Sequence, residues 1–157
     1  MSRRTRGVLR VGLIALVAGG CVTAGTPKMS ADEAIAARQK LMKEQGAAWK
    51  SIQDKAKVGQ VAALAPDAQK LVETSQRIPS LFPEGSLNPA TSRAKPEIWQ
   101  KRSEFEGYAK MLNSRATNLS ATASAGDAQA TNATIASLFR ETCGSCHNAF
   151  RGPEIKK

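Results

Sequence analysis

Four long stretches of this chain repeat apolar residues at intervals of three and four, the spacing of an α-helix with one buried face. The first stretch opens with "SADE", where Ser30 is followed three residues later by Glu33, the pattern of a capping box that starts a helix. This pattern predicts a helix over 31–58, which Gly59 ends. The apolar positions that recur every seven residues along it are Ile35, Met42, Trp49 and Ala56.

Three further helices are predicted from the same spacing. The second begins at about Ala62 or Pro66, ends at Arg77, and is followed by a proline-rich crossing loop over 79–96. The third begins near Pro96 and ends before Gly126, and the fourth covers 127–150. The core-facing positions predicted for the fourth helix are Ala136, Phe139, Cys143, Cys146 and Phe150. With no strand signal in one domain of this length, the pattern predicts an all-α, antiparallel up-down-up-down four-helix bundle.

The N-terminus has the layout of a secretory signal. Arginines precede a short apolar run of about 8 residues, which is too short to span a bilayer. We therefore expect 1–20 to be a signal peptide of an exported, periplasmic bacterial protein. Two endings fit the sequence: a lipobox-like site that leaves Cys21 to carry a lipid anchor, or cleavage after Ala24 that leaves a soluble product. We expect 21–30 to be a flexible linker, 31–152 the folded domain and 153–157 a tail.

The sequence "CGSCH" at 143–147 holds two of the three cysteines and the only histidine. On a helix, Cys143, Cys146 and His147 project from one side, which suits two thioether bonds to a porphyrin and a histidine on its iron. The cofactor predicted from this motif is one covalent haem c. Zinc remains an alternative, but it needs about four ligands and only Cys21 is left as a soft donor. A redox dithiol is the other, but no strand precedes the motif.

The charge balance argues against a nucleic-acid partner. The chain carries a formal net charge of +10, and residues 21–157 carry 19 basic and 13 acidic side chains, a net charge of +6. The basic residues are scattered through helical segments without interleaved aromatic residues, unlike a nucleic-acid binding surface. We expect a solvated surface with mild attraction for acidic partners.

The chain resembles the class II c-type cytochromes, which comprise the cytochrome c′ family and its low-spin, methionine-ligated branch. The matching segments are "RQKLM" at 38–42, "KPEIW" at 95–99 and "CGSCHNAFR" at 143–151, so the likeness covers nearly all of 31–151. The resemblance implies a four-helix bundle with haem attached to the C-terminal helix. It also implies redox partner proteins and a homodimer formed through the first two helices, with Trp49 or Leu41 in the contact. In a monomer, the same two residues would belong to the core.

The resemblance implies a role for each matched residue. Cys143 and Cys146 would hold the haem, and His147 would be the proximal iron ligand. Arg38 and Gln39 match positions that lie against the haem propionates, although Arg38 in a surface salt bridge is an alternative. The residues expected either to line the haem pocket or to pack in the core are Phe82, Ile98 and Trp99.

Met42 separates two functions. As a distal iron ligand its thioether would give a six-coordinate, low-spin one-electron carrier, which is the main prediction. As an apolar cover it would leave a five-coordinate iron open to small gases such as nitric oxide or carbon monoxide. An enzyme is not expected, because no second cluster of ionisable residues accompanies the motif.

Overall fold

The computed structural model describes residues 29–155. The predicted signal peptide, the lipidation site Cys21 and the cleavage site after Ala24 lie outside this range. The α-helices are α1 (Ala31–Lys57), α2 (Ala65–Arg77), α3 (Glu97–Gln100), α4 (Arg102–Ser124), α5 (Ala128–Leu138) and α6 (Ser145–Phe150). Short 3₁₀ turns cover Ala62–Leu64 and Pro79–Leu81, and a π-helical turn, Phe139–Gly144, joins α5 to α6.

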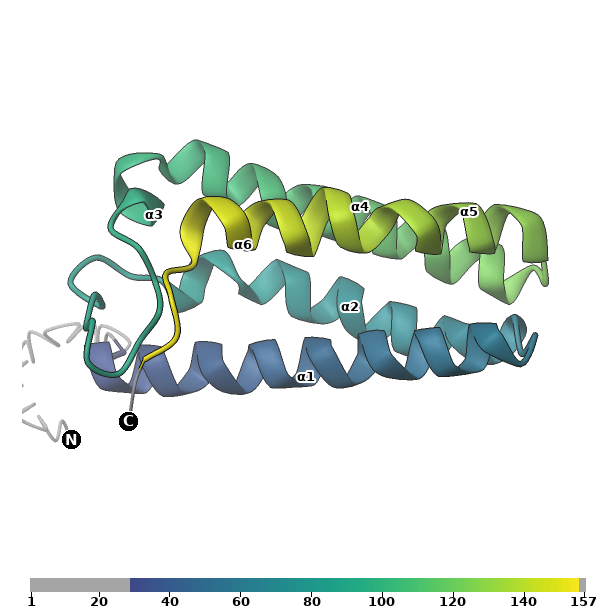
Figure 1. Ribbon diagram of the computed structural model, residues 1–157, viewed down its shortest axis with the longest axis horizontal. Helices are drawn as coiled ribbons and strands as arrows, with labels where there is room; N and C mark the ends of the chain where they lie inside the picture. The colour runs from purple at the N-terminus through teal and green to yellow at the C-terminus, as the bar shows by residue number, and fades with distance from the viewer. Residues whose placement is uncertain (1–28, 156–157) are drawn as a thin grey trace, which may run out of the picture.

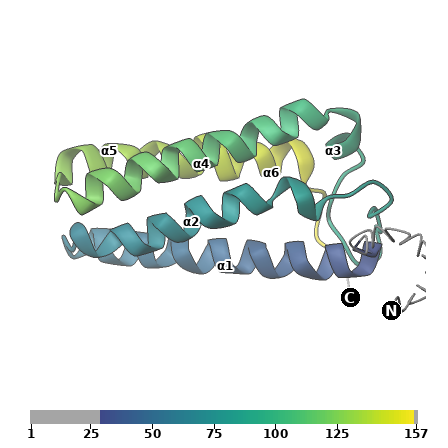
Figure 2. The same ribbon diagram turned by 180° about the vertical axis from the view of Figure 1, so that it is seen from behind.

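The helices form an antiparallel four-helix bundle, which confirms the predicted fold class. α1 pairs with α2, α3 leads into α4, and α5, the π-turn and α6 together make the last helix (Figure 1). Figure 2, which shows the bundle from the opposite side, shows α2 beside α4. The predicted third helix is interrupted at Lys101, where the backbone leaves the helical region.

Local capping fixes the ends of the helices. The Ser30 hydroxyl accepts a hydrogen bond from Glu33 N at 3.3 Å, and Ser30 N donates to Glu33 Oε2 at 2.8 Å, so the predicted capping box is present. Between α4 and α5, Gly126 adopts a positive φ of 71° and Asp127 caps the next helix. A left-handed glycine at this position lets the chain reverse direction without steric strain.

The core is built mainly from aliphatic side chains, with one aromatic cluster at the end nearest α3. Phe105 packs edge-on against Phe82 and Phe150, with ring centroids 4.9 and 5.5 Å apart. Fully buried leucines fill the other layers of the bundle, among them Leu64, Leu119 and Leu138. Within residues 29–155, no helix is long and apolar enough to cross a membrane.

The core face predicted for the last helix is partly wrong. Leu138 and Thr142 are buried against the other helices, whereas Ala136 is exposed and Phe139 is 48% exposed. The π-turn at Phe139–Gly144 contains an extra residue, so the positions after it are rotated around the helix axis relative to a regular helix. The predicted positions Phe139, Cys143, Cys146 and Phe150 all line a cavity, and of these only Phe150 is fully packed in the core, against Phe105.

Candidate functional site

A cavity of about 730 Å³ lies between α1 and the last helix. Its floor is formed by α4 and the 78–82 segment, and one end is closed by the 91–94 loop and the C-terminal tail. Its lining is largely apolar and includes Ile78, Ile98, Ala109 and Leu112. A cavity of this volume suits a large organic group rather than a single metal ion.

The three residues of the C-x-x-C-H motif lie together on the cavity wall. Cys143 and Cys146 are free thiols, half-buried on either side of the junction between the π-turn and α6, and His147 follows them. Burial raises the pKa of the Cys143 thiol, and burial together with Cys143 raises the pKa of Cys146 to about 11. Burial, and then the positive charges of Arg151 and Arg93, lower the pKa of His147, which favours the neutral imidazole that ligates metals.

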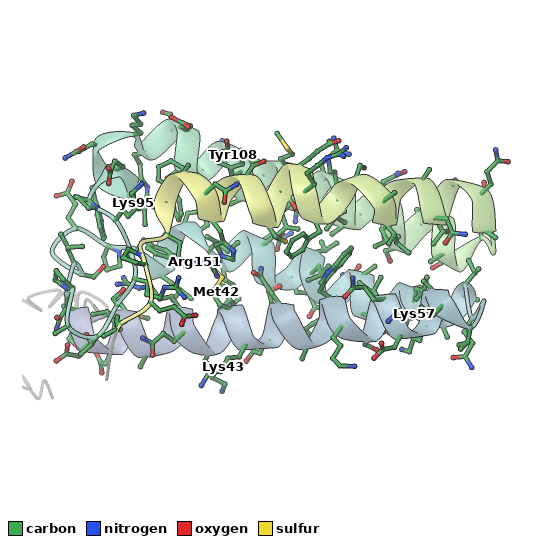
Figure 3. The ribbon with its side chains drawn as sticks, viewed as in Figure 1. Met42, Lys43, Lys57, Lys95, Tyr108 and Arg151 are labelled. Atoms are coloured by element: carbon green, nitrogen blue, oxygen red, sulfur yellow. The ribbon has the colours of Figure 1, made fainter. Side chains whose placement is uncertain are left out.

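An aromatic stack fixes the register of α1 against the last helix. The Trp49 and Phe139 rings stack with centroids 5.8 Å apart. Moving seven residues back along α1 reaches Met42, and moving seven forward along the antiparallel last helix reaches Cys146. Because both segments rise by a similar amount per residue, Met42 lies at about the level of Cys146 and His147. Figure 3 shows Met42 extending from α1 toward the last helix, whereas Lys43 extends away from it.

Arg38 is a buried cation on the cavity wall, 3% exposed. Its guanidinium donates to Ser86 Oγ at 2.9 Å, Ser86 O at 2.8 Å and Ser92 Oγ at 2.7 Å, and it lies 4.8 Å from the centre of the Phe82 ring. Burial lowers its pKa, but a guanidinium stays charged. All of these partners, within residues 29–155, are neutral, so Arg38 is not in a surface salt bridge. The charge of its guanidinium is therefore free to bind an anionic group inside the cavity.

The other predicted pocket residues separate into two groups. Gln39 and Phe82 line the cavity, and Gln39 Nε2 donates to Thr91 O at 2.7 Å. Trp99 is not part of the cavity wall; it packs against the core, which is the second of the two roles expected for it. Its indole nitrogen donates to Phe82 O at 3.2 Å and to Pro83 O at 3.0 Å, which directs the ring toward the loop instead. Trp99 thus fixes the backbone that carries Phe82.

The C-terminal tail and the 91–95 loop form a clamp at the Arg38 end of the cavity. Gly152 N donates to Arg93 O at 2.7 Å, and Arg93 Nε donates to Gly152 O at 2.9 Å. Lys95 adds two bonds to the end of α6: its backbone N donates to Phe150 O at 3.1 Å and its Nζ to Ala149 O at 2.7 Å. This pairing is long-range, so it could not be found from helical periodicity.

Several cavity residues were not singled out from the sequence as site residues. Gln45 and Tyr108 both line the cavity, as does Phe139 from the π-turn. Gln45 lies three residues after Met42 and four before Trp49, so helical spacing puts it on the same face as these two, which is a signal that could have drawn attention to it. No periodicity signal marks Tyr108, because its position depends on how α4 packs behind the cavity.

The cavity has the features required by a covalently held porphyrin. It is large and mainly apolar, it places two thiols and a neutral histidine on one wall, and its wall includes the buried guanidinium of Arg38, a cation that can pair with an anionic substituent. The residues present therefore fit haem c. A four-helix bundle with this motif on its last helix belongs to the class of c-type haem proteins.

Comparison with known proteins identifies the family. The family described as Cytochrome C′ matches residues 33–151. A cytochrome c′ from Pararhodospirillum photometricum is 33% identical over 90 residues, which cover 57% of this chain and 71% of the relative. Another from Rhodopseudomonas palustris is 29% identical over 142 residues, covering 88% and 94%. This chain belongs to the cytochrome c′ family, and its cofactor is covalently attached haem c, as predicted.

Solved structures share the fold. A nitric oxide complex of a cytochrome c′ variant from Alcaligenes xylosoxidans has a TM-score of 0.70 and 23% identity, covering 80% of this chain and 98% of that chain. A cytochrome c′ described as having a ligand-controlled dimer dissociation has a TM-score of 0.70 and 22% identity, covering 79% and 98%. At these identities the likeness supports the fold alone.

Proposed function

We propose that this protein binds small gases such as nitric oxide at a five-coordinate haem c. The observation that carries the proposal is membership of the cytochrome c′ family, in which the chain shares its fold with a nitric oxide complex. The alternative prediction made from the sequence thus has more support than the main one. Bound haem would supply an iron with one open coordination position, and the protein would control access to it.

The roles proposed for the site residues follow from their places on the cavity wall. Cys143 and Cys146 hold the haem through thioether bonds, and His147 is the proximal ligand. Arg38 binds a propionate by charge, and Gln39 lies beside it at the same end of the cavity. Met42, on the opposite wall at the level of His147, covers the distal side of the iron without ligating it.

A second candidate function is one-electron transfer with Met42 as the sixth ligand. The observation in its favour is that the Met42 side chain extends into the cavity at the level of His147 (Figure 3). A thioether ligand would raise the reduction potential and exclude gases. Redox partner proteins would then be required.

One spectroscopic experiment separates the two candidates. The mature holoprotein is examined in its oxidised and reduced forms, before and after addition of carbon monoxide, alongside the Met42→Ala variant. Gas binding predicts a high-spin native spectrum that shifts promptly with carbon monoxide, and a similar high-spin spectrum for Met42→Ala. A low-spin native spectrum that ignores the gas, and becomes high-spin in Met42→Ala, would reject the proposal in favour of electron transfer.

We further propose that the protein works in the bacterial periplasm and is not an enzyme. The periplasmic location rests on the proposed signal peptide over 1–20. Cys21 is the proposed site of a lipid anchor if cleavage occurs before it. Mass spectrometry of the mature N-terminus tests both, because cleavage after Ala24 removes Cys21.

A homodimer is proposed from the dimeric relative described above. Leu41 is 1% exposed and cannot be part of its contact, whereas half-buried Trp49 can. Sedimentation of the mature protein tests the dimer.

A further inference from the structure

Gln45 has a buried amide on the cavity wall, and none of the haem-binding roles proposed above involves it. It is 9% exposed and follows Met42 on α1 by three residues, or about 4.5 Å along the helix axis. By the register that Trp49 and Phe139 set, it lies at about the level of Cys143. It therefore lies beside the distal position proposed for Met42, on the same wall.

The hydrogen bonds of Gln45 leave part of its amide unused. Gln45 Nε2 donates to Thr74 Oγ1 at 3.2 Å. Thr74 Oγ1 gives its own hydrogen to Lys70 O at 2.7 Å, so toward Gln45 it can only accept. This fixes the NH₂ side of the amide toward Thr74. The second N–H and Oε1 have no protein partner in the described part of the chain.

The other residues of this part of the cavity are mainly apolar. Met42 lies one turn before Gln45, and Ile78, Ala109 and Leu112 contribute to the same lining. A buried polar group in such surroundings is costly unless it finds a hydrogen-bond partner. Because Gln45 lines the cavity and one N–H is held by Thr74, the second N–H and Oε1 are the groups left for a small molecule that enters the cavity.

We propose that the free amide N–H of Gln45 donates a hydrogen bond to a diatomic ligand held beside Met42. Such a bond favours a ligand that carries negative charge on its outer atom, and so favours nitric oxide over carbon monoxide. The inference deepens the proposed gas-binding function and rests on it. It assigns the ligand preference of the site to a residue of α1 that lies outside the C-x-x-C-H motif.

The test compares native holoprotein with Gln45→Met, which keeps the side-chain volume and removes the amide. We expect the infrared C–O stretch of bound carbon monoxide to rise in Gln45→Met, because a donor near the oxygen lowers it. We expect nitric oxide to dissociate about threefold to tenfold faster, the loss of one hydrogen bond. The matched control is Asn113→Leu. Asn113 Nδ2 bonds Val72 O at 3.1 Å and Ser75 Oγ at 3.0 Å but does not line this cavity, so both readouts should stay native.

A second variant, Thr74→Val, leaves Gln45 in place and removes the acceptor that orients it. We expect its C–O band to broaden, because the amide then has more than one orientation. An unchanged C–O stretch and dissociation rate in Gln45→Met would overturn the inference, as would a stretch that falls, since that would place Oε1 against the ligand. If the native protein binds neither gas, the proposed function fails by itself. The same comparison in a Met42→Ala background then decides the role of Gln45 separately.

Discussion

Replacing Arg38 by methionine tests the claim that a buried cation joins α1 to the loop over the cavity. The substitution removes three hydrogen bonds, to Ser86 Oγ, Ser86 O and Ser92 Oγ, and the contact with the Phe82 ring. A hydrogen bond from a charged donor contributes about 1.5–3 kcal/mol. These bonds share one guanidinium, and methionine avoids the cost of burying a charge, so their contributions do not add. We expect a net loss of about 2–4 kcal/mol in the free energy of unfolding.

Urea denaturation of the holoprotein, followed by circular dichroism, measures this loss. The control is Arg77→Met, because within residues 29–155 the Arg77 side chain makes only an exposed ion pair with Glu44 at 3.8 Å, and its loss should cost under about 0.5 kcal/mol. A propionate bound to Arg38 would move the result toward the upper end of the range. If Arg38→Met and Arg77→Met lose the same stability, the network that we describe does not hold the loop.

Two further predictions concern residues outside the cavity wall. Trp99→Phe removes the bonds to Phe82 O and Pro83 O and should cost about 1 kcal/mol, while the visible spectrum of the haem stays native; a shifted spectrum would restore Trp99 to the pocket. Gly126→Ala should cost about 1–2 kcal/mol because φ is 71°, whereas Gly107→Ala, inside α4 with nothing within 4 Å of the added carbon, should gain about 0.5–1 kcal/mol. Effects of the same sign in the two glycine variants, measured by thermal unfolding, would contradict this explanation.

The parts of the fold that depend on local interactions were predictable. The Ser30 capping box and the apolar spacing of α1 involve residues within a few positions of each other, and both are present as expected. The last helix was only partly predictable. A regular 3.6-residue period cannot include the π-turn at Phe139–Gly144, and Phe139, predicted on the core face, lines the cavity and is 48% exposed.

Of the candidate site, too, only the part that depends on local spacing was predictable from the sequence. The spacing of Cys143, Cys146 and His147 was enough to indicate haem c, because all three lie within about one turn of helix. The environment of Arg38 was not predictable. Its partners Ser86 and Ser92 lie 48 and 54 residues away in a loop whose path follows no regular period.

By itself, the sequence determined four amphipathic helices and the haem attachment motif, because helical periodicity and the C-x-x-C-H spacing act over a few residues. Only the tertiary structure decided which side chains share the cavity with that motif. The antiparallel register set by Trp49 and Phe139 brings Met42 to the level of His147 and Gln45 to that of Cys143. These pairs lie about a hundred residues apart, and no local pattern encodes them; they follow from packing between helices.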